Sequence, residues 1–271
     1  SGQGGPGAGR PPGRGNALRP KTPRCVIAAP MPPGVMARAE ARFDVEIRDS
    51  NIPRTGSEMR SALALYDGMM PTLGDRFSAD IFAEFGRPRC KILANFGVGY
   101  NHIDVAAARD HGVTVSNTPG AVTDATADIA MTLLLMSARR AAEGERLVRS
   151  GNWTGWHPTQ MLGQQVSGKT VGIIGMGRIG QAIAQRCHFG FGMQVLYSNR
   201  SRKEVDLPAR QVSLIELAEQ SDFIVVAVPG GAETHHMIGT AVFDAMQDHA
   251  HFINIARGDV VDETALVDAL Q

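Results

Sequence analysis

The sequence predicts an α/β protein in which two parallel β-sheets are each covered by helices. The chain of 271 residues is longer than one average domain, and 43% of it is apolar, which is enough to build two cores. Short apolar stretches alternate with helical ones along most of its length. One apolar stretch, at 171–174, runs directly into a segment with regularly spaced glycines. Together these observations predict parallel sheets with helical crossovers.

The first half of the chain alternates strand and helix. Apolar and alternating segments predict strands at Arg24–Ala29, Asp44–Arg48, Tyr66–Leu73, Lys91–Asn95 and Val113–Val115. Helical periodicity between them predicts helices at Gly34–Arg42, Ser57–Leu65 and Ser78–Phe85. We expect Ser57 to cap the second helix, because a serine hydroxyl can accept a hydrogen bond from a free helix amide.

The second half repeats this alternation behind a long helix. That helix is expected to begin near Val122 and to continue to about Val148, where it links the two sheets. Strands are predicted at Val171–Ile174, Gln194–Ser198, Asp222–Val228 and His251–Ala256. Helices are predicted at Gln181–Cys187, Leu214–Glu219, Ala241–Met246 and Glu263–Leu270, the last one begun by Asp262 and Glu263. The chain is therefore expected to divide into a tail at 1–23, a domain at 24–118 and a domain at 119–271.

Composition and charge exclude several classes of protein. Lys+Arg and Asp+Glu both number 27, so the net charge indicates neither a nucleic-acid nor a membrane partner. No apolar run is long enough to span a bilayer, and the histidines lack the spacing of a metal site. Cys25, Cys90 and Cys187 lie far apart and fit reduced thiols in the cytoplasm. Residues 1–23, rich in Gly, Pro and Arg, predict a disordered tail.

Gly175, Gly177 and Gly180 have the G-x-G-x-x-G spacing of a dinucleotide-binding turn. The first glycine permits the tight turn, the second lets the backbone approach a pyrophosphate, and the third lets the next helix pack on the strand. The phosphates would bind the free amides at the positive end of that helix. The alternative is a glycine-rich turn of any α/β protein. The apolar strand before it and the helix after it favour dinucleotide binding.

The second strand of this unit ends in Asn199 and Arg200, where an NAD-preferring site usually has an Asp or Glu for the ribose 2′-hydroxyl. Absence of a carboxylate removes repulsion of a 2′-phosphate, and Arg200 can bind the phosphate oxygens. The alternative is a solvated basic turn. We therefore favour NADP(H) as the cofactor, with NAD(H) as the other possibility.

The loop Asn95–Asp104 follows a predicted strand, where open α/β sheets place their ligands. Gly97 and Gly99 would leave backbone amides available to a carboxylate. The other interpretation is an ordinary strand-to-helix turn with Asp104 as the helix cap. The loop by itself does not decide between the two.

Several stretches occur together in this chain: Asn95–Asp104, Asn117–Gly120, Val166–Gly180, Val228–Pro229 with Thr234, and Asn254–Glu263. Together they resemble the D-2-hydroxyacid dehydrogenase family. Trp153, Trp156 and the Asn199–Arg200 ending are most similar to its glyoxylate/hydroxypyruvate reductase branch.

The resemblance implies a flavodoxin-like substrate-binding domain and a Rossmann NAD(P)-binding domain. It also implies a small 2-keto or 2-hydroxy acid substrate and a homodimer built on the nucleotide domains. Cofactor contacts are expected from Gly175, Gly177, Arg178, Ile179, Gly180, Asn199, Arg200, Ser201, Val228, Pro229, Thr234, Ile255 and Arg257. Substrate contacts are expected from the amides of Val98 and Gly99, and from Trp156, which would reach the partner's active site.

In the family, an arginine that matches Arg257 grips the substrate carboxylate and polarises the keto oxygen. Its planar, permanently charged fork suits this task, because charge grows on the oxygen as hydride arrives. The nicotinamide supplies the hydride. A histidine kept protonated by a glutamate then donates a proton to the new alkoxide.

Two of these catalytic residues have no counterpart here. The family's histidine and glutamate lie beyond the Arg257 motif, and no histidine follows Arg257 before Gln271. Asp128 stands where the family has a glutamate in the linker helix. We therefore expect an NAD(P)-binding domain that is incomplete at its C-terminus. One hypothesis is an NAD(P)H-dependent reductase of glyoxylate or hydroxypyruvate, weak or inactive as this polypeptide. The other is a non-catalytic dinucleotide-binding module.

Overall fold

The computed structural model describes residues 22–271, so nearly all of the predicted tail lies outside the described residues. The chain forms two compact units. One consists of the chain up to Phe96 together with His102–Ser116, and the other of Gly97–Asn101 together with Asn117–Gln271. Each unit contains one five-stranded sheet whose paired strands all run parallel. The predicted fold of two parallel-sheet α/β units is therefore confirmed. The predicted boundary between independent domains, after residue 118, stays a proposal.

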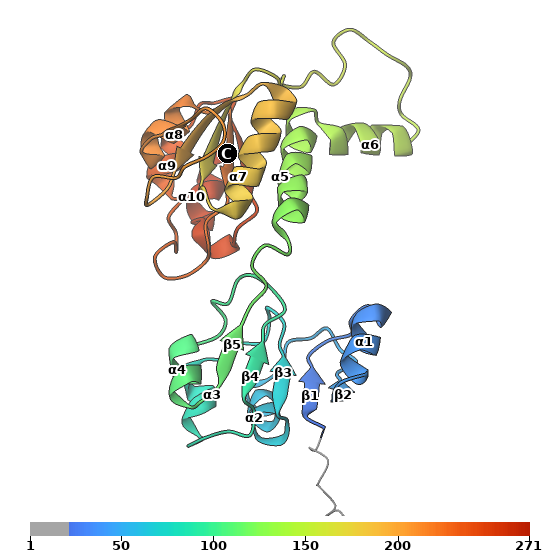
Figure 1. The fold of residues 1–271 in the computed structure, drawn as a ribbon. Coiled ribbons are helices and arrows are strands. Elements are labelled where there is room, and N and C mark those ends of the chain that lie inside the picture. Colours follow the sequence, from blue (N-terminus) through green and yellow to red (C-terminus); the bar gives the residue numbers. More distant parts are fainter. Residues whose placement is uncertain (1–21) are drawn as a thin grey trace, which may run out of the picture. The chain divides into compact units, whose positions relative to one another are not determined.

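The sheet of the first unit has the order β2-β1-β3-β4-β5 (Figure 1). Its strands are β1 (Arg24–Ile27), β2 (Asp44–Ile47), β3 (Gly68–Met70), β4 (Ile92–Ala94) and β5 (Thr114–Ser116). Its helices are α1 (Pro33–Glu40), α2 (Gly56–Leu65), α3 (Ala79–Ala83) and α4 (Val105–Asp110). The core joins α2, α3 and α4 to the sheet, with Leu63, Phe82 and Leu93 completely buried. Burial of these apolar side chains is the main force that holds the unit together.

One helix start in this unit differs from the sequence expectation, and another agrees with one of two interpretations. Thr55, not Ser57, caps α2: the Thr55 hydroxyl accepts from the Glu58 amide at 3.3 Å, and the Glu58 carboxylate accepts from the Thr55 amide at 2.7 Å. This reciprocal pair satisfies two amides that the helix leaves open, which a cap at Ser57 would not. The short helix α4 begins as one of the two interpretations of the preceding loop expects, because Asp104 caps it by accepting from the Ala107 amide at 2.9 Å.

The sheet of the second unit has the order β10-β9-β6-β7-β8. Its strands are β6 (Thr170–Ile174), β7 (Gln194–Ser198), β8 (Ala209–Gln211), β9 (Phe223–Val226) and β10 (His251–Asn254). Its helices are α5 (Thr123–Ala138), α6 (Ala141–Arg149), α7 (Arg178–Gln185), α8 (Leu214–Gln220), α9 (Thr240–Asp244) and α10 (Glu263–Ala269). A π-helical turn, Arg186–Gly190, continues α7, and a 3-10 turn, Gly258–Val260, precedes α10.

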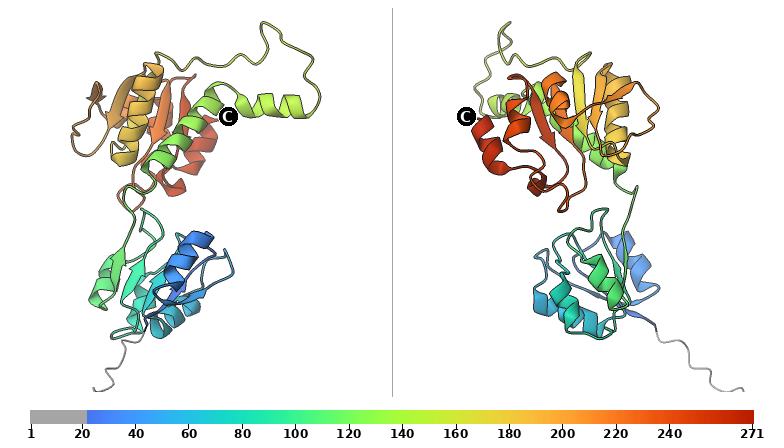
Figure 2. Two further views of the ribbon diagram at one scale, coloured as in Figure 1. Left: turned by 45° about the vertical axis from the view of Figure 1, so that its right-hand side comes forward. Right: turned by 90° about the vertical axis from the view of Figure 1, so that its left-hand side faces the viewer.

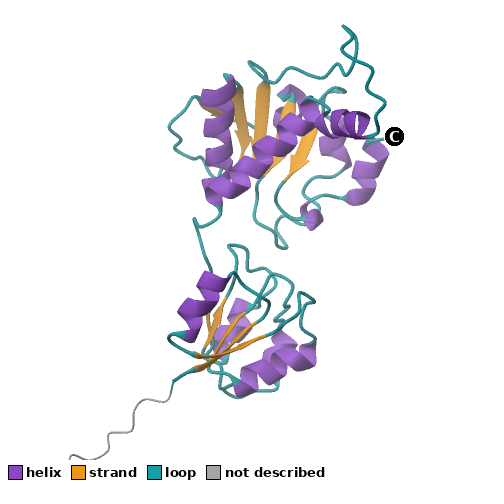
Figure 3. Ribbon diagram, turned by 90° about the vertical axis from the view of Figure 1, so that its right-hand side faces the viewer, coloured by secondary structure: helices purple, strands orange, loops and turns teal. Residues whose placement is uncertain are grey.

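Helices cover both faces of this second sheet (Figure 3). Ile173 and its neighbours pack against α5 and α7 on one face, whereas Ile174 packs against α8, α9 and α10 on the other. Both side chains are completely buried, because successive residues of a strand point to opposite faces. This two-sided burial explains the continuous apolar runs of β6 and β9.

The prediction of one long helix from Val122 to Val148 is wrong, because this segment forms two separate helices, α5 and α6. Arg140 has a left-handed backbone with φ of 53°, which ends α5 and redirects the chain. Its guanidinium binds Glu143 in the first turn of α6 at 2.7 Å. No residue of α6 is buried, and the helix points away from the second sheet (Figure 2). The segment 150–169 then returns to β6.

Candidate cofactor and substrate site

The order in which the strands of the second sheet are added reverses at β6. From β6 the chain adds β7 and β8 on one side and then β9 and β10 on the other. The loops after β6 and β9 therefore separate at this edge, which is where open α/β sheets bind their ligands. The predicted glycine turn is the loop that follows β6.

Two glycines of this turn are required by its geometry. Gly175 has φ of 99°, and a Cβ there would lie 2.8 Å from the carbonyl carbon of Ala227 and 2.9 Å from Val228 Cγ1. A Cβ on Gly180 would overlap the carbonyl oxygen of Gly175 and lie 3.3 Å from Ile173 Cγ2. The absence of a side chain at Gly175 lets the turn approach the end of β9, and its absence at Gly180 lets the first turn of α7 approach the end of β6.

Gly177 differs because it faces open space. No heavy atom lies within 4 Å of a Cβ built on Gly177, the residue that precedes α7. The first hydrogen bond of the helix runs from the Gln181 amide to the Gly177 carbonyl at 2.9 Å. The amides of Arg178 and Ile179 come before this ladder, at the positive end of the helix dipole. Open space beside such amides suits an anionic group such as a pyrophosphate.

Asn199 ties the end of β7 to the glycine turn. Its side-chain oxygen accepts from the Met176 amide at 3.1 Å, and its side-chain nitrogen donates to the Ser201 carbonyl at 2.7 Å. The Gln211 side chain donates to the Asn199 carbonyl at 2.8 Å. An aspartate could make the first of these bonds but not the second, because a carboxylate has no hydrogen to donate. Asn199 thus shapes the turn that carries Arg200 and Ser201.

Arg200 points its charge into solvent from this turn. Its side chain is 87% exposed, and Nη1 lies 2.8 Å from Oε2 of Glu233, which is 82% exposed. Glu233 belongs to the loop after β9, where Thr234 donates its hydroxyl to the Pro229 carbonyl at 2.7 Å. Thr234 therefore closes the loop that presents Glu233.

Arg257 lies just beyond β10, at the same carboxyl edge. Asn254 braces its backbone twice: the Asn254 side chain donates to the Arg257 carbonyl at 2.9 Å and accepts from the Ala256 amide at 2.9 Å. The Ile255 amide donates to the Val226 carbonyl at 3.2 Å, which holds this turn beside the end of β9. The direction in which Arg257 leaves the sheet is therefore fixed by the Asn254 side chain and by one backbone hydrogen bond.

The Arg257 side chain lies against the backbone of two glycines. A Cβ on Gly99 would overlap Nη2 of Arg257 and lie 3.4 Å from Cζ, and a Cβ on Gly230 would lie 2.8 Å from Cγ. The Asn117 side chain donates to the Val98 carbonyl at 2.9 Å. Because a trans peptide is planar, this bond also fixes the direction of the Gly99 amide. The structure therefore brings Val98, Gly99 and Arg257 together within the second unit.

Other residues considered from the sequence lie in different surroundings. His102 belongs to the first unit, where its Nε2 lies 3.0 Å from the Asn95 side-chain oxygen. Asp128, on α5, forms an ion pair at 2.9 Å with Arg186, which lies in the turn that continues α7. Trp156 is 78% exposed in the segment between α6 and β6.

Sequence reasoning missed three side chains that shape this site. Asn117 follows β5 of the first sheet and Asn254 ends β10 of the second, and the carboxyl end of a parallel strand is a position that indicates a ligand-facing loop. Glu233 stands beside Thr234 with no local pattern to mark it, because its partner is 33 residues away.

The opposite, amino edge of the second sheet carries a separate cluster of charges. Burial alone would raise the pKa of Asp222, but bonds from the Thr170 amide at 2.9 Å and from His249 at 2.9 Å hold it below its usual value. These partners start or precede strands, so the cluster joins strand beginnings and is far along the sheet from the glycine turn.

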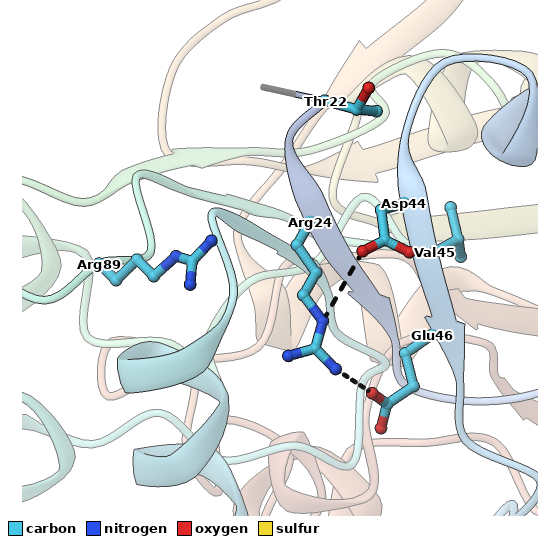
Figure 4. A pocket seen from close by; sticks show the side chains of 6 residues that line it. All are labelled: Thr22, Arg24, Asp44, Val45, Glu46 and Arg89. Atoms are coloured by element: carbon cyan, nitrogen blue, oxygen red, sulfur yellow. Dashed lines mark hydrogen bonds and ion pairs between the residues drawn. The ribbon is translucent and has the colours of Figure 1, made fainter. Parts of the chain in front are cut away.

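The first unit also has a hollow of about 510 Å³ at the amino ends of β1 and β2 (Figure 4). Arg24 there binds Glu46 at 2.9 Å, and Arg89 binds Asp67 at 2.9 Å. The charges of the hollow therefore already have partners within the protein. Among residues 22–271, no group of three or more His, Cys, Asp and Glu side chains is arranged to hold a metal ion. In the same range, no helix combines the length and apolarity needed to cross a membrane.

Comparison with known proteins gives a consistent set of relatives. Residues 131–271 match the model of the NAD-binding domain of D-isomer specific 2-hydroxyacid dehydrogenases. The chain is 42% identical over 256 residues to a glyoxylate reductase of Thermococcus onnurineus, covering 92% of this chain and 76% of that protein.

Solved structures agree with these matches. A putative D-isomer specific 2-hydroxyacid dehydrogenase from Polaromonas superimposes with a TM-score of 0.83 at 37% identity, covering 92% of this chain and 78% of that one. An acyclic imino acid reductase in complex with NADPH and D-Arg has a TM-score of 0.82 at 26% identity, covering 91% and 78%.

Proposed function

The chain belongs to the D-isomer specific 2-hydroxyacid dehydrogenase family, and from this premise we propose that it reduces a small 2-keto acid, glyoxylate or hydroxypyruvate, with NADPH. The observation that carries the proposal is Arg257, which lies against Gly99 at the same sheet edge as the glycine turn. The relatives named glyoxylate reductase support glyoxylate, the two-carbon keto acid, as a substrate.

Arg257 would hold the substrate. Its guanidinium can bind a carboxylate with two parallel hydrogen bonds and stabilise charge that develops on the adjacent keto oxygen. The Gly99 amide would bind the other carboxylate oxygen, with its direction set by the bond from Asn117 to the Val98 carbonyl. When bound, the nicotinamide supplies the hydride. The open space at Gly177 and the amides of α7 fit the cofactor's pyrophosphate.

NADPH is favoured over NADH by the turn after β7. Asn199 carries no charge that would repel a 2′-phosphate, and Arg200 offers an exposed guanidinium one residue later. The structural relative that holds NADPH supports a place for this cofactor on the same fold.

A dinucleotide-binding module without turnover is the second candidate for this polypeptide. It is favoured by His102, the histidine of the loop after β4, because its Nε2 already lies 3.0 Å from the side-chain oxygen of Asn95. Steady-state oxidation of NADPH in the presence of glyoxylate distinguishes the two. Turnover that is lost in Arg257→Lys supports the reductase. Tight NADPH binding without turnover supports the module, and turnover abolished by His102→Ala would make His102 the proton donor.

We further propose a homodimer formed through α5 and the segment after α6. Ile129, Leu133 and Met136 are spaced along one face of α5 and are 56%, 41% and 41% exposed. Trp153 and Trp156 are 53% and 78% exposed on the projecting segment. A second copy would bury these apolar groups together.

Sedimentation equilibrium tests the dimer. Leu133→Glu should give a monomer, because it places a charge within the apolar face of α5. The control is Ile52→Glu, which introduces the same charge at a 72% exposed apolar residue of the first unit and should leave the protein dimeric. A dimer that survives Leu133→Glu would contradict the assignment. We also place the protein in the cytoplasm, because Cys25, Cys90 and Cys187 are all free thiols, as is usual for proteins of a reducing compartment.

A further inference from the structure

An exposed ion pair joins the two loops on either side of the glycine turn. Arg200 follows β7 and Glu233 follows β9, and these strands flank β6 on opposite sides. Nη1 of Arg200 lies 2.8 Å from Oε2 of Glu233. The pair therefore links the loop that reads the adenosine ribose to the loop beyond β9, at the edge where the dinucleotide would lie.

We propose that Glu233 is a specificity-determining residue that competes with the 2′-phosphate of NADPH for Arg200. This inference rests on the proposed NADPH preference and deepens it. The 2′-phosphate and the Glu233 carboxylate are both anionic acceptors, and a guanidinium bound to one must release it, wholly or in part, to form a two-pronged contact with the other.

The exposure of the pair determines which partner prevails. Both side chains are more than four-fifths exposed, so water and salt screen their attraction and the pair is readily exchanged. A phosphate carries up to two charges and three acceptor oxygens, so it displaces the single carboxylate. NADH has no 2′-phosphate and leaves the ion pair in place. Glu233 thus weakens NADPH binding selectively and reduces discrimination between the cofactors.

The Asn199 side chain does not share this competition. Both its polar atoms already bond to backbone, at Met176 and Ser201, and they retain those bonds whichever anion Arg200 binds. The effect of Glu233 should therefore pass through Arg200 alone.

Dissociation constants for NADPH and NADH, measured by nicotinamide fluorescence, test the proposal. Glu233→Gln should tighten NADPH binding about two- to fivefold, the range of an exposed ion pair, and leave NADH within about 1.5-fold. Glu219→Gln removes the same charge from an exposed position of α8 and should change neither constant. In an Arg200→Ala background, Glu233→Gln should have no effect on NADPH, because the contested cation is gone.

Three results would overturn the proposal. If Glu233→Gln leaves NADPH binding unchanged while Arg200→Ala weakens it, Glu233 does not compete and the NADPH preference stands. If Glu233→Gln tightens NADPH and NADH equally, the residue is a general barrier to dinucleotides. If Arg200→Ala fails to weaken NADPH selectively, the proposed cofactor preference itself is wrong.

Discussion

Substitutions at two glycines of one turn should have opposite main effects, one on the stability of the fold and the other on cofactor binding. We consider Gly180→Ala and Gly177→Ala, which each add a single methyl group. At Gly180 the methyl group would overlap the Gly175 carbonyl oxygen, and both overlapping groups are fixed by the backbone. At Gly177 no heavy atom lies within 4 Å of the added carbon.

The expected cost at Gly180 follows from this overlap. Overpacking costs about 3 kcal/mol at the upper end of its usual range, and the gain in helix propensity from alanine offsets about 1 kcal/mol. The net loss of about 2 kcal/mol corresponds to a fall in Tm of about 4–8 °C for a unit of this size. Gly177→Ala should cost only about 0.5 kcal/mol, the difference between glycine and alanine before a helix.

Binding should show the reverse order of effects. The methyl group of Gly177→Ala would occupy the open space assigned to the pyrophosphate, so NADPH affinity should fall about tenfold or more, equivalent to ~1.4 kcal/mol. Thermal unfolding without cofactor and a fluorescence titration with NADPH measure the two quantities. Wild-type NADPH affinity in Gly177→Ala would refute the placement of the pyrophosphate, and wild-type Tm in Gly180→Ala would refute the packing of α7 on β6.

Three further changes test other parts of the site and fold. Arg257→Lys should lower the affinity for a keto acid about 100-fold, or kcat/KM by the same factor where turnover is measurable, because lysine keeps the charge but loses the two-pronged contact. Values near those of the wild-type protein would show that Arg257 has only a structural role. Asn199→Asp should reverse the cofactor preference, since it adds a negative charge and loses the bond to the Ser201 carbonyl; an unchanged ratio of NADPH to NADH affinity would argue against the turn. Burial lowers the pKa of His251, whose Nδ1 lies 2.6 Å from the Ser137 hydroxyl. The neutral His251 side chain therefore contributes its full stability above the unfolded pKa of about 6.5, and this contribution is lost as the pH falls below that value. We expect His251→Gln to flatten the decline of Tm between about pH 7 and 5. Parallel pH profiles of Tm for the variant and the wild-type protein would exclude this role.

Local patterns in the sequence were sufficient to predict every strand of the two sheets except β8. β6, β7 and β9 are apolar runs buried on both faces, and the glycine spacing after β6 has a steric cause that adjacent residues reveal. The short strand β8 (Ala209–Gln211) was missed because its exposed residues show no apolar pattern. The break at Arg140 was missed because arginine is a good helix former, and only the backbone geometry identifies it.

The site was predictable where its residues lie in contiguous motifs. Arg257 and the glycine turn are of this kind. The bond from Asn117 to the Val98 carbonyl spans 19 residues, and the ion pair of Arg200 with Glu233 spans 33. Pairings of this length depend on how loops from different strands meet, which no local spacing encodes.

Formation of a ternary complex tests the central claim most directly. Oxalate carries a carboxylate beside a second carbonyl group but cannot accept hydride, so its binding needs no proton donor. We predict that oxalate changes the fluorescence of protein-bound NADPH in a saturable manner, and that Arg257→Lys weakens this binding about 100-fold without changing NADPH affinity. Failure of the wild-type protein to bind NADPH, or oxalate binding that is indifferent to Arg257→Lys, would contradict the proposed 2-keto acid site.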